Sequence, residues 1–74
     1  MITLGDLLET INNDEWVTIK LRNEETNALL DWWYGPPSSL LTPKEAGHLC
    51  HAFVDEIAVS MGDILITILI GTEG

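Results

Sequence analysis

The last third of the chain has the clearest alternation of apolar and polar positions. Residues 55–70 contain two β-branched runs separated by Gly62-Asp63, and a glycine-led turn between such runs is typical of a β-hairpin. A two-residue turn at this point gives three cross-strand pairs: Met61 with Ile64, Val59 with Ile66, and Ile57 with Ile68. All of these side chains are apolar, and alternation places them on one face. We predict that this face belongs to the core.

The other face of the last strand is partly apolar as well, because Leu65 and Leu69 alternate with isoleucines. Apolar residues on both faces are typical of a strand in the interior of a sheet. We therefore expect residues 64–70 to form a central strand.

The N-terminal segment has the pattern of an amphipathic helix. Thr3 is a favourable N-cap, and Asp6 falls at the third helical position, which is a capping-box arrangement. Apolar residues recur at helical spacing and form one stripe: Leu4, Leu7, Leu8 and Ile11. We predict a helix over residues 2–13 that ends at the polar run Asn12-Asn13-Asp14.

A strand is predicted over residues 16–22, where apolar and polar residues alternate strictly. Val17, Ile19 and Leu21 are expected to face the core. The alternating residues then project from the opposite face, which we call the outer face of the sheet: Trp16, Thr18, Lys20 and Arg22.

A second strand is predicted over residues 28–34, after the polar turn 23–27. One choice of facing would bury Asp31, so we expect the alternative set to face the core: Leu30, Trp32 and Tyr34. Under this choice Trp33 projects from the outer face beside Trp16.

The segment between the two pairs of strands begins with a break and continues with a helix signal. Residues 35–39 read Gly-Pro-Pro-Ser-Ser and are expected to follow an extended, polyproline-like path. Thr42 as N-cap, Pro43 at the first helical position and Glu45 at the third predict the start of a second helix. Its apolar face would contain Ala46, Leu49, Cys50 and Phe53.

Together these elements predict an α+β fold with the order α-β-β-α-β-β and a single domain over residues 1–74. The simplest assembly is a four-stranded antiparallel sheet packed with two helices. Because the last strand is expected to be central, we predict the spatial order second, first, fourth, third.

Charge limits the classes of partner. The chain has 74 residues and is 46% hydrophobic, which suits one small core, yet twelve acidic residues against three basic ones give a net charge of -9. Phosphates would be repelled, so direct binding to nucleic acid or to an anionic membrane is disfavoured. A basic partner is favoured, and solubility alone is the alternative explanation.

Cysteine content and apolar runs indicate the compartment. The single cysteine, Cys50, excludes an intramolecular disulfide, which fits a reducing environment. The N-terminus lacks the pattern of a signal peptide, and the apolar runs are too short to span a bilayer. We predict a cytoplasmic protein.

The only residues of metal-ligand type that lie close in the sequence are His48, Cys50 and His51, with Asp55 one helical turn further on. The set is incomplete for structural zinc, and Cys50 belongs to the apolar stripe, where a thiol is inert. We therefore expect a solvated helix face, with no metal and no cofactor. No carboxylate pair, phosphate-binding loop or Ser-His-Asp order is present, so we predict no catalytic residues and no enzyme activity.

Residues 6–21 read DLLETINNDEWVTIKL and resemble the start of small prophage anti-CRISPR proteins that inhibit Cas9. Those proteins also begin with a short amphipathic helix, a polar Asn/Asp turn and a strand of the Thr-Val-Lys-Leu type. They are small and strongly acidic, and they block the DNA-binding groove by mimicking the charge of DNA. The resemblance implies a phage-encoded, non-enzymatic inhibitor of a CRISPR effector that acts in the host bacterial cytoplasm.

The carboxylates around the first hairpin are our candidates for binding a basic nucleic-acid-binding protein: Asp14, Glu15, Glu24, Glu25 and Asp31. The alternative function is a small protein-protein interaction or structural module without an inhibitory role.

A second set of candidates concerns self-association. The outer face needs cover, and both predicted helices are required by the core face, so we expect a homodimer. Its interface would contain the outward apolar residues Trp16, Trp33, Leu65 and Leu69. The alternatives are that one helix crosses to the outer face, or that this patch binds the target.

Overall fold

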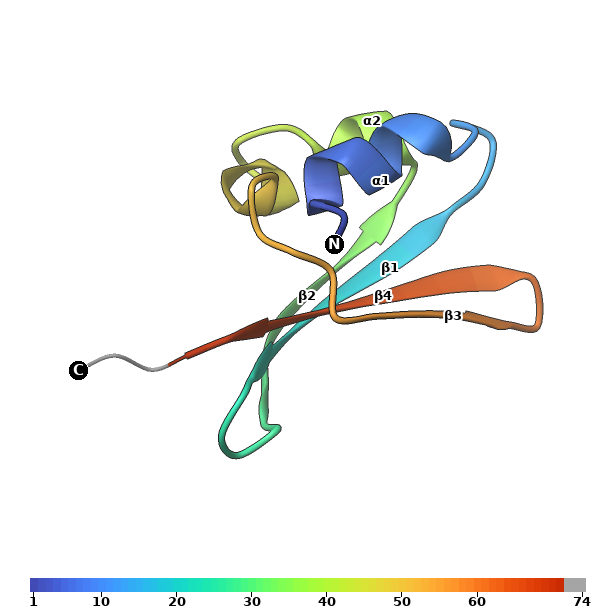
Figure 1. Cartoon of the computed structure of the whole chain (residues 1–74). Coiled ribbons are helices and arrows are strands. Elements are labelled where there is room, and N and C mark those ends of the chain that lie inside the picture. Colours follow the sequence, from blue (N-terminus) through green and yellow to red (C-terminus); the bar gives the residue numbers. More distant parts are fainter. Residues whose placement is uncertain (72–74) are drawn as a thin grey trace.

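A computed structural model describes residues 1–71 and places short helices over one face of a four-stranded sheet (Figure 1). The predicted α+β fold and its element order are confirmed. The elements are α1 (Leu4–Thr10), β1 (Val17–Asn23), β2 (Leu29–Gly35), α2 (Pro37–Leu40), the 3-10 helix η1 (Ala46–Leu49), β3 (Glu56–Ser60) and β4 (Asp63–Ile70).

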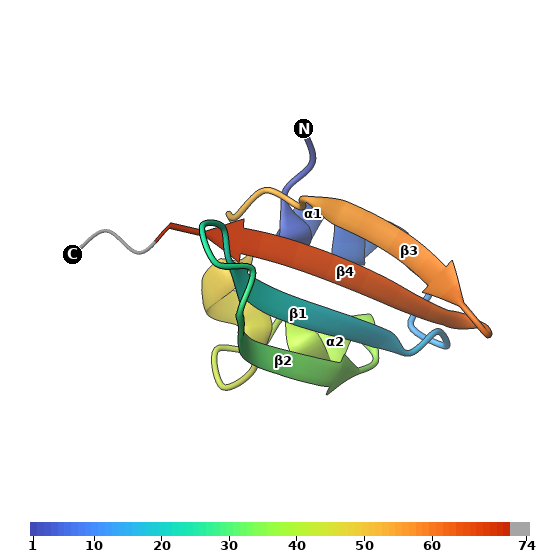
Figure 2. The same cartoon turned by 90° about the horizontal axis from the view of Figure 1, so that it is seen from below.

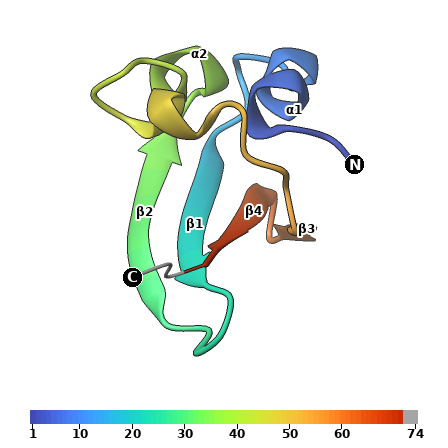
Figure 3. The same cartoon turned by 60° about the vertical axis from the view of Figure 1, so that its left-hand side comes forward.

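The strands are ordered β2-β1-β4-β3, so the predicted spatial order and the central position of the last strand are confirmed. The expectation of an antiparallel sheet is wrong at one place, because β1 and β4 run parallel while both hairpins are antiparallel. The reason lies in residues 36–55, which pass through the helical layer from the end of β2 to the other edge of the sheet, where β3 begins beside Thr67 (Figure 3). β3 therefore runs in the direction of β2, and β4 in the direction of β1.

The turn of the second hairpin is Met61-Gly62, one residue earlier than predicted. Ser60 pairs with Asp63, and both turn residues have positive φ, 52° and 86°, which is the signature of the tight turn that matches strand twist. The predicted pairs are therefore wrong by two positions: Ile57 pairs with Ile66, not with Ile68. A shift of two keeps each residue on its predicted face.

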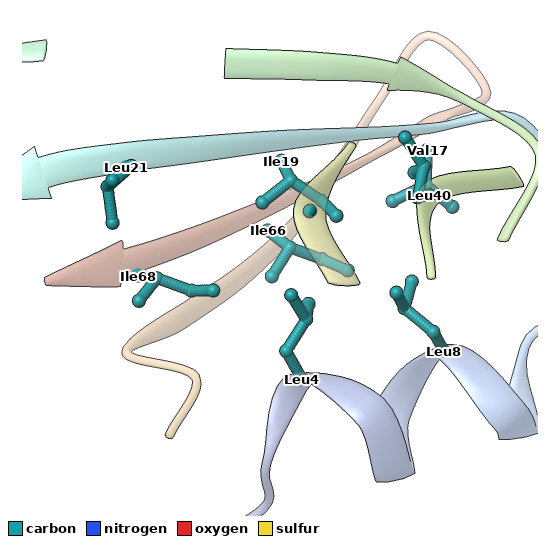
Figure 4. Close-up of a cluster of buried hydrophobic side chains, with 9 residues drawn as sticks. Leu4, Leu8, Val17, Ile19, Leu21, Leu40, Ile66 and Ile68 are labelled. Carbon is teal, nitrogen blue, oxygen red and sulfur yellow. The ribbon is translucent and has the colours of Figure 1, made fainter. Parts of the chain in front are cut away.

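The core lies between the inner face of the sheet and the helical layer. Val17, Ile19 and Leu21 of β1 are buried there, as predicted. They meet side chains from α1, β4 and the connecting segment (Figure 4): Leu4, Leu8, Leu40, Ala46, Ile66 and Ile68. β3 lies outside this cover, so Val59 is 71% exposed although it is on the inner face.

The connecting segment differs most from its prediction. Pro37 begins the short helix α2 at a position expected to be extended, because proline suits the first helical position. The Thr42 hydroxyl donates to the Ser39 carbonyl oxygen at 2.8 Å, so Thr42 follows α2 and caps no second helix. Gly47 N–H donates to the Thr42 carbonyl oxygen at 3.0 Å, which folds the chain back tightly. Only the single turn η1 remains of the predicted second helix.

The predicted N-cap of α1, Thr3, is confirmed, but the helix covers Leu4–Thr10 and is shorter at both ends than the predicted range 2–13. The Thr3 hydroxyl accepts from the Asp6 N–H at 3.3 Å, which satisfies one of the free N–H groups of the first turn. Two more are satisfied from the connecting segment, since Leu4 N–H donates to the Ala52 carbonyl at 2.8 Å and Gly5 N–H donates to the Cys50 carbonyl at 2.9 Å.

Thr3→Ala is expected to lower the free energy of unfolding by about 1 kcal/mol, because the Asp6 N–H loses its partner. The matched control is Thr10→Ala at the other end of α1, where the hydroxyl donates to the Leu7 carbonyl at 2.7 Å and caps no free N–H. Urea denaturation should show a clearly smaller change for the control. Equal losses would contradict the capping role of Thr3.

Candidate functional site

No helix of residues 1–71 lies over the outer face of the sheet (Figure 2). Cross-strand register assigns its residues, because directly paired residues share a face. In the middle of the sheet, Lys20 of β1 pairs with Trp32 of β2 on one side and with Thr67 of β4 on the other. Thr67 in turn pairs with Glu56 of β3. One row of the outer face therefore contains, from edge to edge, Glu56, Thr67, Lys20 and Trp32.

The predicted facing of β2 is wrong. Trp33 pairs with Ile19 and lies on the inner face, where its ring makes a T-shaped contact with the His48 ring at a centroid distance of 5.8 Å. Leu30, Trp32 and Tyr34 are about half exposed instead of buried: 47%, 58% and 50%. Asp31 does lie on the inner side, opposite Leu21, but β2 is an edge strand and leaves its carboxylate in solvent.

The outer face therefore has an aromatic group that differs from the predicted one. Trp16 projects there as expected and packs on Tyr34, with ring centroids 5.0 Å apart and planes tilted by 54°. Trp32, and not Trp33 as predicted, lies on the outer face beside them. The register of the first hairpin is the signal that separates the two tryptophans, and it cannot be derived from the alternation of β2 alone.

An open hollow of about 360 Å³ lies over the middle of the outer face. Leu65, Thr67 and Leu69 of the central strand β4 are among its lining residues, as the outward facing of the two leucines predicted. One side is basic, with Lys20 and Arg22 of β1, and the other is acidic, with Asp55 and Glu56 at the start of β3. The Arg22 Nη1 donates to the Asn27 carbonyl oxygen at 3.0 Å, which holds the guanidinium near the end of the strand.

The hollow thus lies between two charged columns of opposite sign. Two of the three basic residues of the chain, Lys20 and Arg22, line this hollow. The alternation of residues 16–22 predicts that Lys20 and Arg22 lie on the outer side of their strand, but it does not predict that Asp55 and Glu56 lie near them. That proximity follows from the parallel pairing of β1 with β4.

The predicted acidic set falls into separate groups. Asp14 and Glu15 are exposed before the start of β1, and Glu24 and Glu25 are exposed in the turn after its end. The seven residues of β1 separate these two groups, and they span about 23 Å at the rise per residue of a strand. Asp31 lies between them on β2.

The Glu24-Glu25 turn is held by a buried side chain. Asn23 is 6% exposed, and its Oδ1 accepts from the N–H groups of Glu25 at 2.8 Å and of Thr26 at 3.1 Å. The two carboxylates are therefore presented on an ordered turn rather than on a loose loop.

Within residues 1–71, no group of three or more His, Cys, Asp and Glu side chains is placed to hold a metal ion. The expected helix face with His48, His51 and Asp55 does not exist, because η1 ends at Leu49. Cys50 is a free, partly buried thiol. In the same part of the chain, no helix is long and apolar enough to cross a membrane.

Comparisons with protein-family models, with curated proteins and with solved structures gave no match. Fold and surface define a small acidic α+β protein with one open sheet face. Among residues 1–71 this surface carries exposed charge and exposed aromatic rings, side-chain types that are common in protein interfaces.

Proposed function

We propose that this protein is a non-enzymatic inhibitor that binds a basic nucleic-acid-binding protein and blocks its nucleic-acid site by charge mimicry. The proposal is carried by one observation: the net charge is -9, and the carboxylates of the described residues are almost all exposed. Exposed residues are Asp6, Glu9, Asp14, Glu15, Glu24, Glu25, Asp31, Asp55, Glu56 and Asp63. Such a surface attracts a basic groove and accelerates association with it.

The spacing of the acidic groups supports the same proposal. The Asp14-Glu15 and Glu24-Glu25 groups lie beyond the two ends of β1, whose seven residues span about 23 Å. One turn of duplex DNA has a length of about 34 Å. A groove that holds a duplex turn therefore offers basic residues over the distance that these two groups span.

The class of target comes from the resemblance of residues 6–21 to Cas9 inhibitors. CRISPR effectors hold their guide–target heteroduplex in a positively charged channel, which is the kind of surface that an acidic competitor fits. We propose a CRISPR effector as the partner and a phage as the source of the chain. No cofactor and no catalytic step is part of this function.

The experiment is a competition assay with a panel of guide-loaded CRISPR effectors of several types. DNA binding is followed by fluorescence anisotropy while the purified protein is added. For the correct effector, DNA binding should fall, and the inhibition should weaken as salt concentration rises, because exposed charges are screened. Unimpaired DNA binding by every effector tested would remove the proposal.

Three variants with the same change of net charge locate the contact. Asp14→Asn/Glu15→Gln and Glu24→Gln/Glu25→Gln neutralise the two groups at the ends of β1, and Asp6→Asn/Glu9→Gln on α1 is the matched control. Loss of a direct ion contact should raise the half-inhibitory concentration by about tenfold for at least one end group. Equal effects of all three variants would show that net charge alone acts.

The second candidate is a protein-binding module that uses the outer face without charge mimicry. It is favoured by three half-exposed aromatic side chains on that face, Trp16, Trp32 and Tyr34, since Trp and Tyr are enriched in interfaces. Neutralising Asp14, Glu15 and Asp31 together should abolish partner binding under the first proposal and spare it under the second.

A further inference from the structure

The outer face exposes a broad set of apolar side chains that the described chain does not cover. Trp32 is 58% exposed, Trp16 and Tyr34 are 50% exposed, and Leu65 and Leu69 lie half-buried in the sheet beside them. The inner face has the helical layer (Figure 2). Exposed apolar patches of this kind on small domains mark interaction surfaces.

Charge on this face is arranged in columns that run along the strands. Lys20 and Arg22 form a basic column on β1, and Glu56, with the preceding Asp55, forms an acidic one at β3. Both lie beside the apolar column of β4. Lys20 and Glu56 are at the same level, because both pair with Thr67, and they are separated by two strand spacings, about 10 Å.

We propose that two copies of this chain associate outer face to outer face, about a twofold axis that runs over β4 parallel to the strands. This rotation exchanges the two sides of β4 and preserves the level along the strand. Lys20 of each copy then lies opposite Glu56 of the other copy, and the Leu65–Leu69 column meets itself. Two sheets packed in this way lie about 10 Å apart, and their side chains fill the space between them.

The column order is the reason to choose a second copy as the occupant. A uniformly basic partner would be attracted by Asp55 and Glu56 but repelled by Lys20 and Arg22. A uniformly acidic partner would be attracted by the basic residues and repelled by the acidic ones. A twofold-related copy places each Lys20 opposite a Glu56, because every contact in such an interface occurs twice. In this arrangement Trp32 and Tyr34 of β2 extend past the partner's β3 and cover the open edge that β3 forms. All residues of β3 are exposed in the single chain.

This inference goes beyond the inhibitory function and does not depend on it. Asp14, Glu15, Glu24 and Glu25 lie outside the strands, at the two ends of β1. They stay accessible in the dimer, so a failure to inhibit any effector leaves the dimer test untouched.

Sedimentation equilibrium at micromolar concentrations tests the association. The expected mass is twice the 8.2 kDa of one chain. Lys20→Glu should raise the dissociation constant of the dimer by about tenfold or more, because it sets two carboxylates against each other at both symmetry-related contacts. The matched control is Lys44→Glu, which makes the same charge change on an exposed residue before η1 and should leave the mass unchanged. A monomeric wild-type chain overturns the proposal.

Mixing two variants tests the geometry itself. Lys20→Glu and Glu56→Lys should each dimerise poorly, since each sets like charges against each other. A mixture of the two should form a heterodimer, because the carboxylate introduced in the first variant meets the ammonium group introduced in the second. The native pairing of Lys20 with Glu56 is restored at the other contact. Circular dichroism confirms that each variant is folded. If Lys20→Glu behaves like Lys44→Glu, or if the mixture does not associate, this interface is wrong.

Discussion

Ile66→Ala is expected to lower the free energy of unfolding by about 3 kcal/mol. Ile66 is fully buried in the central strand β4, with Ile19 beside it on β1 and Ile57 beside it on β3. The lost side chain leaves a cavity that a central strand cannot close. Because the total stability of a 74-residue domain is about 4–11 kcal/mol, the variant should unfold at a much lower urea concentration.

The matched control is Ile57→Ala, which makes the same chemical change at the cross-strand partner. Ile57 is 49% exposed, because the helical layer does not cover β3. Its substitution should lower the free energy of unfolding by about 1 kcal/mol. Urea denaturation followed by tryptophan fluorescence measures both variants. Equal losses would place Ile57 in the core, as the sequence-based pairing with Ile68 implied.

Local patterns were sufficient for much of this fold. The alternation of Val17, Ile19 and Leu21 identified the inner face of β1, and the Thr3 cap identified the start of α1. Apolar residues on both faces of β4 correctly predicted its central position and hence the strand order. Each of these inferences needs only a period of two or a cap, and such signals lie within a few residues of one another.

The errors arose where the outcome depends on distant residues. Both facings of β2 offer large apolar side chains, and in the structure Trp33 packs on the core and contacts His48, fifteen positions later in the chain. The cost of burying a carboxylate argues against an inward Asp31, yet an edge strand leaves this residue exposed on the inner side. The parallel pairing of β1 and β4 likewise follows from the path of residues 36–55, on which strand alternation has no bearing.

The candidate site was predicted in the same uneven way. Trp16, Leu65 and Leu69 do lie on the outer face, whereas Trp33 does not. The opposition of Lys20 and Glu56 across β4 requires the register of three strands, and no pattern within one strand contains it. Self-association and inhibition both stay predictions that the proposed measurements decide.

Gly47→Ala is expected to lower the free energy of unfolding by about 3 kcal/mol. A Cβ at this position would lie 2.6 Å from the Thr42 carbonyl oxygen and still closer to that of Leu41, and both are backbone atoms that cannot rotate away. Relief would require the turn to open, which would break the hydrogen bond from Gly47 N–H to the Thr42 carbonyl. Urea denaturation again gives the change in stability.

The sign of this effect separates the observed turn from the helix that the sequence predicted. In a regular helix beginning at Thr42, Gly47→Ala would raise stability by about 1 kcal/mol, because alanine is the better helix former. Gly62→Ala is the matched control: Gly62 has φ +86° and open space around its Cβ position, so only the backbone conformation is penalised, by about 1 kcal/mol. We expect the larger loss at Gly47. A gain there would mean that residues 42–53 form a helix and that the tight return of the chain is wrong.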